Sequence, residues 1–162
     1  MEFLIISDIH DNLVNLEKCV NWGRGAEITN AICCGDVVNS ETLAYLAENF
    51  KTIYLVRGNL EIYEESEIKK HKNINYLGWF GAFEIDNKTI GLCHEPWYID
   101  SILKIKLCQL VFYGHTHEPW LKEKDGLITA NPGTLGGVFN KASFAVYDSL
   151  SGQLELKILE LL

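Results

Sequence analysis

Short apolar segments alternate with amphipathic helical patterns over residues 1–56, and this alternation constrains the fold more than any other feature. Continuous apolar runs at 3–6, 28–34 and 53–56 are typical of strands that are buried on both faces. Between them, 13–23 and 40–50 carry apolar residues at helical spacing, with Asp11-Asn12 and Ser40 as the predicted N-caps. The order strand, helix, strand, helix, strand predicts right-handed βαβ units and a parallel sheet.

The rest of the chain is rich in strands. A hairpin is predicted for 80–85 and 89–93, a helix for 99–107, and further strands for 110–113, 120–121, 127–130, 143–147 and 154–159. The charged segment 61–72 is expected to be a short surface helix or an ordered loop, and its glutamates at 61, 64, 65 and 67 a solvated face. No linker or internal repeat interrupts the pattern, so residues 1–162 are predicted to form a single domain.

Composition excludes several classes of protein. With 14 Lys and Arg against 22 Asp and Glu, the net charge of −8 makes a nucleic-acid polymer an unlikely partner. No apolar stretch has the length of a membrane span, and the N-terminus lacks a signal-peptide pattern, so a cytoplasmic location without membrane contact is expected. The five cysteines form no CxxC pair and lie mostly in apolar runs, which predicts buried free thiols.

Polar residues of metal-binding type follow the predicted strands. Ligands of open α/β sheets bind at the carboxyl ends of the strands, and glycines at 35, 58 and 114 would let the backbone turn close to an ion. Side chains two residues apart in extended backbone point the same way, so each D-x-H or H-x-H pair can face one centre. The candidate ligands are Asp8, His10, Asp36, Asn59, His94, His115 and His117.

The residue types of this set indicate which ions it could hold. Mixed Asp, His and Asn ligands suit Mn²⁺, Fe²⁺, Ni²⁺ or Zn²⁺, and the lack of cysteine argues against a structural zinc site. Seven ligands are too many for one ion. They suit two divalent ions that share a carboxylate and keep positions open for water and substrate.

The motifs D-x-H, G-D, G-N, H and G-H-T-H, in this order, resemble the calcineurin-like metallophosphoesterase superfamily. The chain length and the closing Asn-Pro-Gly-Thr segment resemble its small prokaryotic phosphodiesterases. The resemblance implies a four-layer α/β/β/α sandwich of two mixed sheets flanked by helices. It also implies hydrolysis of a small-molecule phosphodiester by a hydroxide that bridges two metal ions, with Mn²⁺ the favoured metal.

The resemblance assigns the ligands residue by residue. One metal would be held by Asp8, His10, Asp36 and His117, and the other by Asp36, Asn59, His94 and His115. Asp36 would then be the bridging carboxylate, and Asp36, Asn59 and His94 are the residues expected to be catalytic.

Two departures from the family pattern affect the expected chemistry. Leu60 stands where many members have the histidine of G-N-H, and His94-Glu95-Pro96 replaces a frequent His-Gly-His. A missing general acid would favour substrates with good leaving groups. Glu61, Glu95 and His71 are substitutes that the sequence does not rank.

Other functions and roles stay open at this level. A protein-binding scaffold resembling the retromer subunit of the superfamily is one alternative, and a phosphomonoesterase is another. The aromatic residues 97, 98 and 120 could stack on a nucleobase or belong to the core, and Arg57 is expected to pair with an acid. The physiological substrate, the native metal and the oligomeric state are not predicted, although a homo-oligomer is compatible with the sequence.

Overall fold

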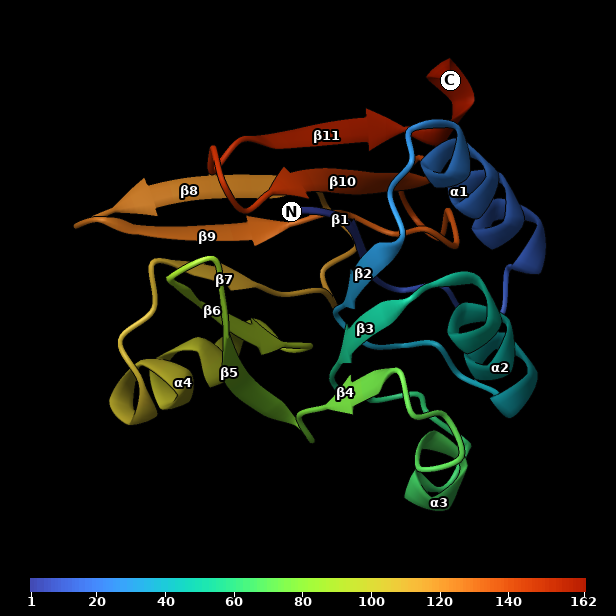
Figure 1. The fold of residues 1–162 in the computed structure, drawn as a ribbon, viewed down its shortest axis with the longest axis horizontal. Coiled ribbons are helices and arrows are strands. Elements are labelled where there is room, and N and C mark those ends of the chain that lie inside the picture. Colours follow the sequence, from blue (N-terminus) through green and yellow to red (C-terminus); the bar gives the residue numbers. More distant parts are fainter.

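The computed structural model describes residues 1–162 as eleven strands and four α-helices (Figure 1). The strands are β1 (Glu2–Ile6), β2 (Asn30–Cys33), β3 (Thr52–Leu55), β4 (Ile74–Tyr76), β5 (Phe80–Ile85), β6 (Lys88–Cys93), β7 (Leu110–Phe112), β8 (Trp120–Lys124), β9 (Leu127–Asn131), β10 (Ser143–Asp148) and β11 (Leu154–Ile158). The helices are α1 (Leu13–Gly25), α2 (Ser40–Asn49), α3 (Glu65–Ile68) and α4 (Ile99–Ile105), with short 3-10 turns at Pro96–Tyr98 and Leu159–Leu161.

The strands form two mixed sheets. The first has the order β11-β10-β1-β2-β3-β4, in which β1 to β4 are parallel, β10 is antiparallel to β1, and β11 is antiparallel to β10. The second has the order β5-β6-β7-β9-β8, in which β6, β7 and β9 are parallel and the two edge strands antiparallel. The predicted parallel βαβ units and the pair of mixed sheets are therefore confirmed.

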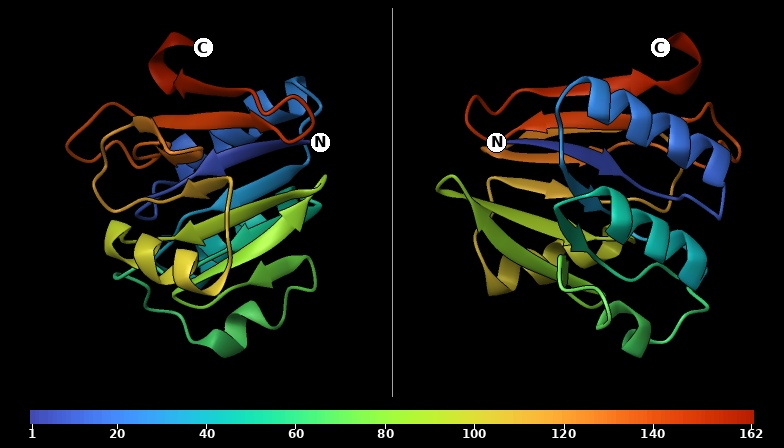
Figure 2. Two further views of the ribbon diagram at one scale, coloured as in Figure 1. Left: turned by 90° about the vertical axis from the view of Figure 1, so that its left-hand side faces the viewer. Right: turned by 45° about the vertical axis from the view of Figure 1, so that its right-hand side comes forward.

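The layers follow from the burial of β1 on both faces. Leu4 and Ile6 pack under α1 and α2, whereas Phe3 and Ile5 pack against the second sheet. A third apolar cluster lies between the second sheet and α4. Figures 1 and 2 show helices on the outer faces of the two sheets, which gives the expected four-layer α/β/β/α arrangement.

The helix starts agree with the sequence to within one residue. Asn12 caps α1, since its side chain accepts a hydrogen bond from the Asn15 amide at 3.1 Å. The N-cap of α2 is Asn39 rather than Ser40, because the Asn39 side chain accepts from the Thr42 amide at 2.9 Å and Ser40 is already helical. Asn and Ser are equally good caps, so the pattern alone does not choose between adjacent ones.

Three further expectations can be compared with the structure. The five cysteines are buried and free, as predicted. Strand β4 was not predicted, because three residues with one strongly apolar member give no clear period. None of the helices is long and apolar enough to cross a bilayer.

Candidate metal centre

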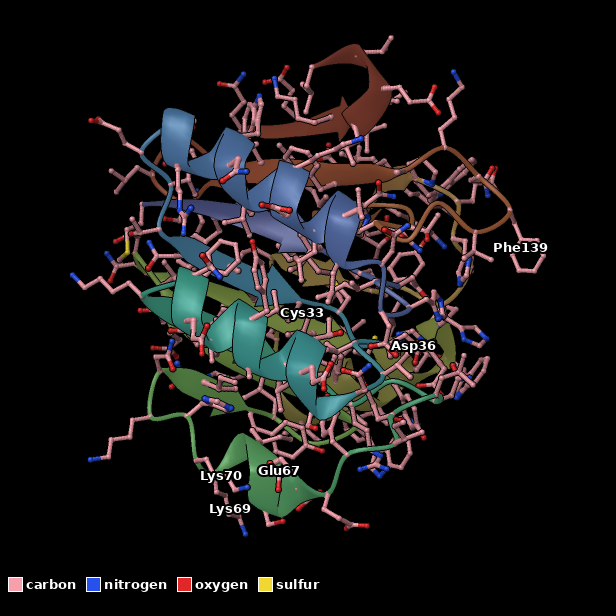
Figure 3. The ribbon with its side chains drawn as sticks, turned by 90° about the vertical axis from the view of Figure 1, so that its right-hand side faces the viewer. Cys33, Asp36, Glu67, Lys69, Lys70 and Phe139 are labelled. Atoms are coloured by element: carbon pink, nitrogen blue, oxygen red, sulfur yellow. The ribbon has the colours of Figure 1, made fainter.

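All seven predicted ligand residues lie together at the carboxyl ends of β1, β2, β3, β6 and β7. Asp8 and His10 follow β1, Asp36 follows β2, and Asn59 follows β3. From the second sheet, His94 follows β6, and His115 and His117 follow β7. Asp36 lies near this end of the molecule in Figure 3. The two sheets thus contribute facing loops to one site.

The first group of ligand atoms consists of Asp8, His10 and His117. Nε2 of His117 is 3.1 Å from Oδ1 of Asp8 and 3.1 Å from Nε2 of His10. Nε2 of His10 is 3.7 Å from the same Asp8 oxygen. These three atoms are close enough to bind one ion.

The second group surrounds Asn59. Its Oδ1 lies 3.0 Å from Nε2 of His94 and 3.0 Å from Nδ1 of His115. Oδ2 of Asp36 is 3.4 Å from Nε2 of His94 and 3.8 Å from Nε2 of His10, so this carboxylate reaches both groups. Asp8 also reaches the second group, with its Oδ1 4.0 Å from Nε2 of His94.

The outer hydrogen bonds of two histidines orient their lone pairs toward the site. Nδ1 of His94 is 2.8 Å from the Cys34 carbonyl, and Nδ1 of His117 is 3.0 Å from the Val138 carbonyl. Because a carbonyl only accepts, Nδ1 is assigned the proton, and Nε2 of a neutral ring then presents a lone pair. On a neutral ring these lone pairs would face oxygen acceptors at 3.0–3.1 Å, so the site needs either a second proton on the ring or a cation between the atoms.

The buried charge also fits a divalent cation. Asp8 and Asp36 are buried, neither forms an ion pair with Lys or Arg, and Oδ1 of Asp8 has no hydrogen-bond partner. Buried carboxylates are costly unless they are paired or coordinate a metal. Burial lowers the pKa of His94, but the neighbouring carboxylates of Asp36 and Asp8 outweigh it and raise the pKa to about 9. The site therefore attracts positive charge, and its residues fit the metal ions that the family implies.

The backbone at the ligands is left-handed rather than extended, which corrects the reason given for the i, i+2 pairs. Values of φ are 52° for Asp8, 48° for His10, 53° for Asp36, 68° for His115 and 60° for His117. Asp and His adopt this region more often than most residues, and such conformations cluster at functional sites. The paired side chains face the site because tight loops turn them there.

Glycines leave room for these loops. A Cβ on Gly58 would overlap the backbone nitrogen and Oδ1 of Asp36. A Cβ on Gly114 would overlap the Ser7 hydroxyl and lie 2.8 Å from Oδ2 of Asp8. Both positions exclude larger residues because a Cβ would clash with neighbouring atoms, and not because the backbone has a positive φ.

Glu61 is the main functional residue that the sequence reasoning misplaced. It is buried, not part of a solvated face, and its carboxylate accepts hydrogen bonds from the amides of Val37, Val38 and Gly58 at 2.8–3.2 Å. Burial raises the pKa of Glu61, although these backbone donors oppose the shift. The side chain joins the loop of Asp36 to that of Asn59, so it positions two of the candidate ligands. The one available signal was its place directly after Gly-Asn-Leu.

The segment 131–136 supports the loops from the other side. The Thr134 hydroxyl donates to the Asp8 carbonyl at 3.0 Å, and Nδ2 of Asn131 donates to the Gly114 carbonyl at 2.9 Å.

Arg57 departs from expectation because its guanidinium lies over the Trp79 ring at 5.4 Å instead of pairing with an acid.

Comparisons with known proteins identify the family of the chain. The profile of the calcineurin-like phosphoesterase superfamily domain matches residues 1–152. Phosphodiesterase MJ0936 of Methanocaldococcus jannaschii is 29% identical over 143 residues, which cover 85% of this chain and 86% of that protein. A probable metallophosphoesterase of Methanothermobacter thermautotrophicus is 24% identical over 139 residues, covering 80% and 74%.

Solved structures share the fold at lower identity. The structure of an archaeal phosphodiesterase superposes with a TM-score of 0.86 at 24% identity, covering 98% of this chain and 99% of the other. Wild-type Vps29 of Entamoeba histolytica complexed with Zn²⁺ gives 0.70 at 20% identity, covering 97% of each chain. The profile match spans nearly the whole chain, and the chain belongs to the calcineurin-like phosphoesterase superfamily.

Proposed function

We propose that this protein is a phosphodiesterase that hydrolyses a small-molecule phosphodiester with two divalent metal ions, of which Mn²⁺ is the best candidate. The observation that carries the proposal is the acceptor-rich site itself. Seven side chains of metal-binding type converge there, two buried carboxylates lack a Lys or Arg partner, and one carboxylate oxygen has no hydrogen bond.

Each end of the site has a different character. Asp8, Asp36 and His94 are buried and would hold the ions, with Asp36 shared between them. Asn59 is exposed and His115 partly exposed, so phosphoryl oxygens can approach at this end. Two bound divalent ions would supply an activated water and neutralise the charge that develops on the phosphoryl oxygens.

Leu60 supports a preference for good leaving groups. Its amide donates to Oδ1 of Asp36 at 2.9 Å and thereby orients that carboxylate, but its half-exposed side chain has no proton to give. Glu61 is held by backbone amides, so it is not a free donor in its place. Esters whose alcohols leave without protonation should therefore react best.

The test is hydrolysis of bis(4-nitrophenyl) phosphate and of 4-nitrophenyl phosphate by metal-stripped protein with Mn²⁺, Ni²⁺, Zn²⁺ or Mg²⁺ added back. We expect metal-dependent turnover, faster for the diester, that is lost in Asp36→Ala and kept in Asp125→Ala, a change at an exposed hairpin turn. No diester turnover with any of the four ions would refute the proposal. Faster turnover of the monoester would favour a phosphomonoesterase.

A protein-binding scaffold is the second candidate, and the shared fold with Vps29 structures favours it. One of these Vps29 structures is a complex with Zn²⁺, so metal binding alone does not separate the two functions. Turnover does separate them. Metal binding with no hydrolysis of either ester would favour the scaffold.

A further inference from the structure

Two exposed aromatic side chains stand at the two ends of the metal centre. The Trp97 ring is 5.3 Å from the His115 ring and meets it edge-on. The Phe139 ring is 5.6 Å from the His117 ring. Because His115 belongs to the group around Asn59 and His117 to the group around Asp8, the two rings flank the ligand set.

Phe139 is held in place without being buried. Its side chain is 93% exposed, and its φ of 66° is unusual for a bulky residue. The preceding residue, Val138, accepts the hydrogen bond from His117, which fixes this loop to the metal centre. Figure 3 shows Phe139 projecting outward from its loop. An exposed ring contributes little to the core, so this ring is available to contact a bound molecule.

Trp97 is similarly placed. It lies in the 3-10 turn Pro96–Tyr98, directly after His94-Glu95, and its side chain is 62% exposed. The proline at the start of the turn restricts the backbone there. The indole is therefore attached to a restricted turn, lies next to His115 and is open to solvent.

The loops that carry the ligands provide few positive charges for additional phosphate groups. Arg57 is their one cationic residue, and its guanidinium lies over Trp79. Lys141, the next cation after the Phe139 loop, pairs with Glu160 at 3.0 Å. Recognition outside the phosphodiester group must therefore depend on apolar contact more than on charge.

We infer that Trp97 and Phe139 are specificity-determining residues that bind a flat aromatic ring on the alcohol parts of the phosphodiester. Stacking on exposed aromatic side chains is favourable for any ring with a π-face, so a nucleobase and an aryl group share the required chemistry. This inference deepens the proposed function and rests on it for the identity of the substrate group.

The turnover test uses three diesters that release the same 4-nitrophenolate, so that the chemical step is matched. They are bis(4-nitrophenyl) phosphate, thymidine 5′-(4-nitrophenyl phosphate) and methyl 4-nitrophenyl phosphate. Loss of a stacking residue should raise KM about 5- to 100-fold for the diesters with a second ring. We expect this in whichever of Trp97→Ala and Phe139→Ala removes the ring that contacts the alcohol that is not released, with a clearly smaller change for the methyl ester. The KM values of the thymidine diester and of the bis(4-nitrophenyl) diester show whether a nucleobase or an aryl ring is preferred.

Matched controls separate this effect from a general loss of surface hydrophobicity. Trp120→Ala removes a half-exposed tryptophan on β8, and Leu107→Ala removes an 83% exposed leucine. Both should leave the three KM values unchanged, and Trp97→Phe should retain most of the ring preference. Equal KM changes for ring and methyl diesters in the two alanine variants would overturn the inference.

A binding measurement makes the inference independent of turnover. Diphenyl phosphate and dimethyl phosphate carry the same charge and can be titrated calorimetrically into manganese-loaded protein. We expect tighter binding of the diphenyl ester by wild type, a smaller difference in Trp97→Ala or Phe139→Ala, and loss of the difference when both residues are replaced by alanine. If no ester is hydrolysed but this preference holds, the proposed function fails and the ring site stands. If esters are hydrolysed and both phosphates bind equally, the ring site fails alone.

Discussion

Replacement of Asp36 by asparagine tests the metal centre most directly. Asp36 is 2% exposed, its Oδ1 accepts from the Leu60 amide, and its Oδ2 faces His94 and His10 at 3.4 and 3.8 Å. Asparagine has the same shape and keeps the Oδ1 acceptor, but it removes the negative charge. The substitution therefore changes metal binding far more than packing.

The expected magnitude follows from linkage between binding and folding. An ion at a free concentration of 100 times its Kd stabilises the folded state by about 2.7 kcal/mol per site. For a chain of this size, 1 kcal/mol shifts Tm by about 2–4 °C, so each site should add about 5–11 °C. If Asp36 serves both ions, Asp36→Asn should lose most of the shift for both.

Thermal unfolding of chelator-treated protein, with and without Mn²⁺, measures this shift. We expect wild type and the hairpin-turn control Asp125→Asn to gain about 10–22 °C from two sites with Mn²⁺, and Asp36→Asn to gain only a small part of this. Without metal, the three proteins should unfold within a few degrees of one another. A full Mn²⁺ shift in Asp36→Asn would refute the shared-carboxylate assignment.

Four further predictions concern neighbouring residues. Leu60→His should speed hydrolysis of alkyl phosphodiesters at least tenfold more than that of nitrophenyl diesters, and equal effects on both would exclude a leaving-group role for this position. Glu61→Ala should lower the unfolding free energy by about 3 kcal/mol or more, measured by urea denaturation, because three backbone amides lose their acceptor; Glu61→Gln should cost less. Gly58→Ala should weaken Mn²⁺ binding in calorimetry, since its Cβ would displace Asp36. The pKa of His94 is about 9 in the folded protein against 6.5 for a free histidine, so its protonation stabilises metal-stripped protein. This stabilisation is complete below pH 6.5 and is lost as the pH rises through 9. Thermal unfolding measured against pH should show this loss for metal-stripped protein and not for Mn²⁺-saturated protein.

Much of the site could be predicted because strand ends and ligand motifs coincide. Apolar runs such as 3–6 and 53–56 have the composition of strands buried on both faces, and the parallel order brings their carboxyl ends to one edge. The polar residues after them then have to meet. This inference needs only strand positions to within one or two residues, which the pattern provides.

The misplaced elements depend on contacts that the sequence does not display. Glu61 lies among charged residues, and only the fold reveals the backbone amides of Val37, Val38 and Gly58 that it satisfies. Strand β4 is similarly defined by its pairing with β3, where Ile53 lies opposite Ile74, more than by its own composition. Both depend on long-range partners that the local pattern does not specify.

The strained ligand loops favour a metal-dependent role over a purely structural one. Five of the candidate ligand residues have left-handed backbone, a conformation that costs of order 1 kcal/mol or more for each residue. Hydrogen bonds between loops maintain it, among them Ile9 amide to Asp36 carbonyl at 3.0 Å and Gly136 amide to Asp8 carbonyl at 2.9 Å. The strained loops bring acceptor atoms close together, and a cation bound between these atoms would stabilise that arrangement.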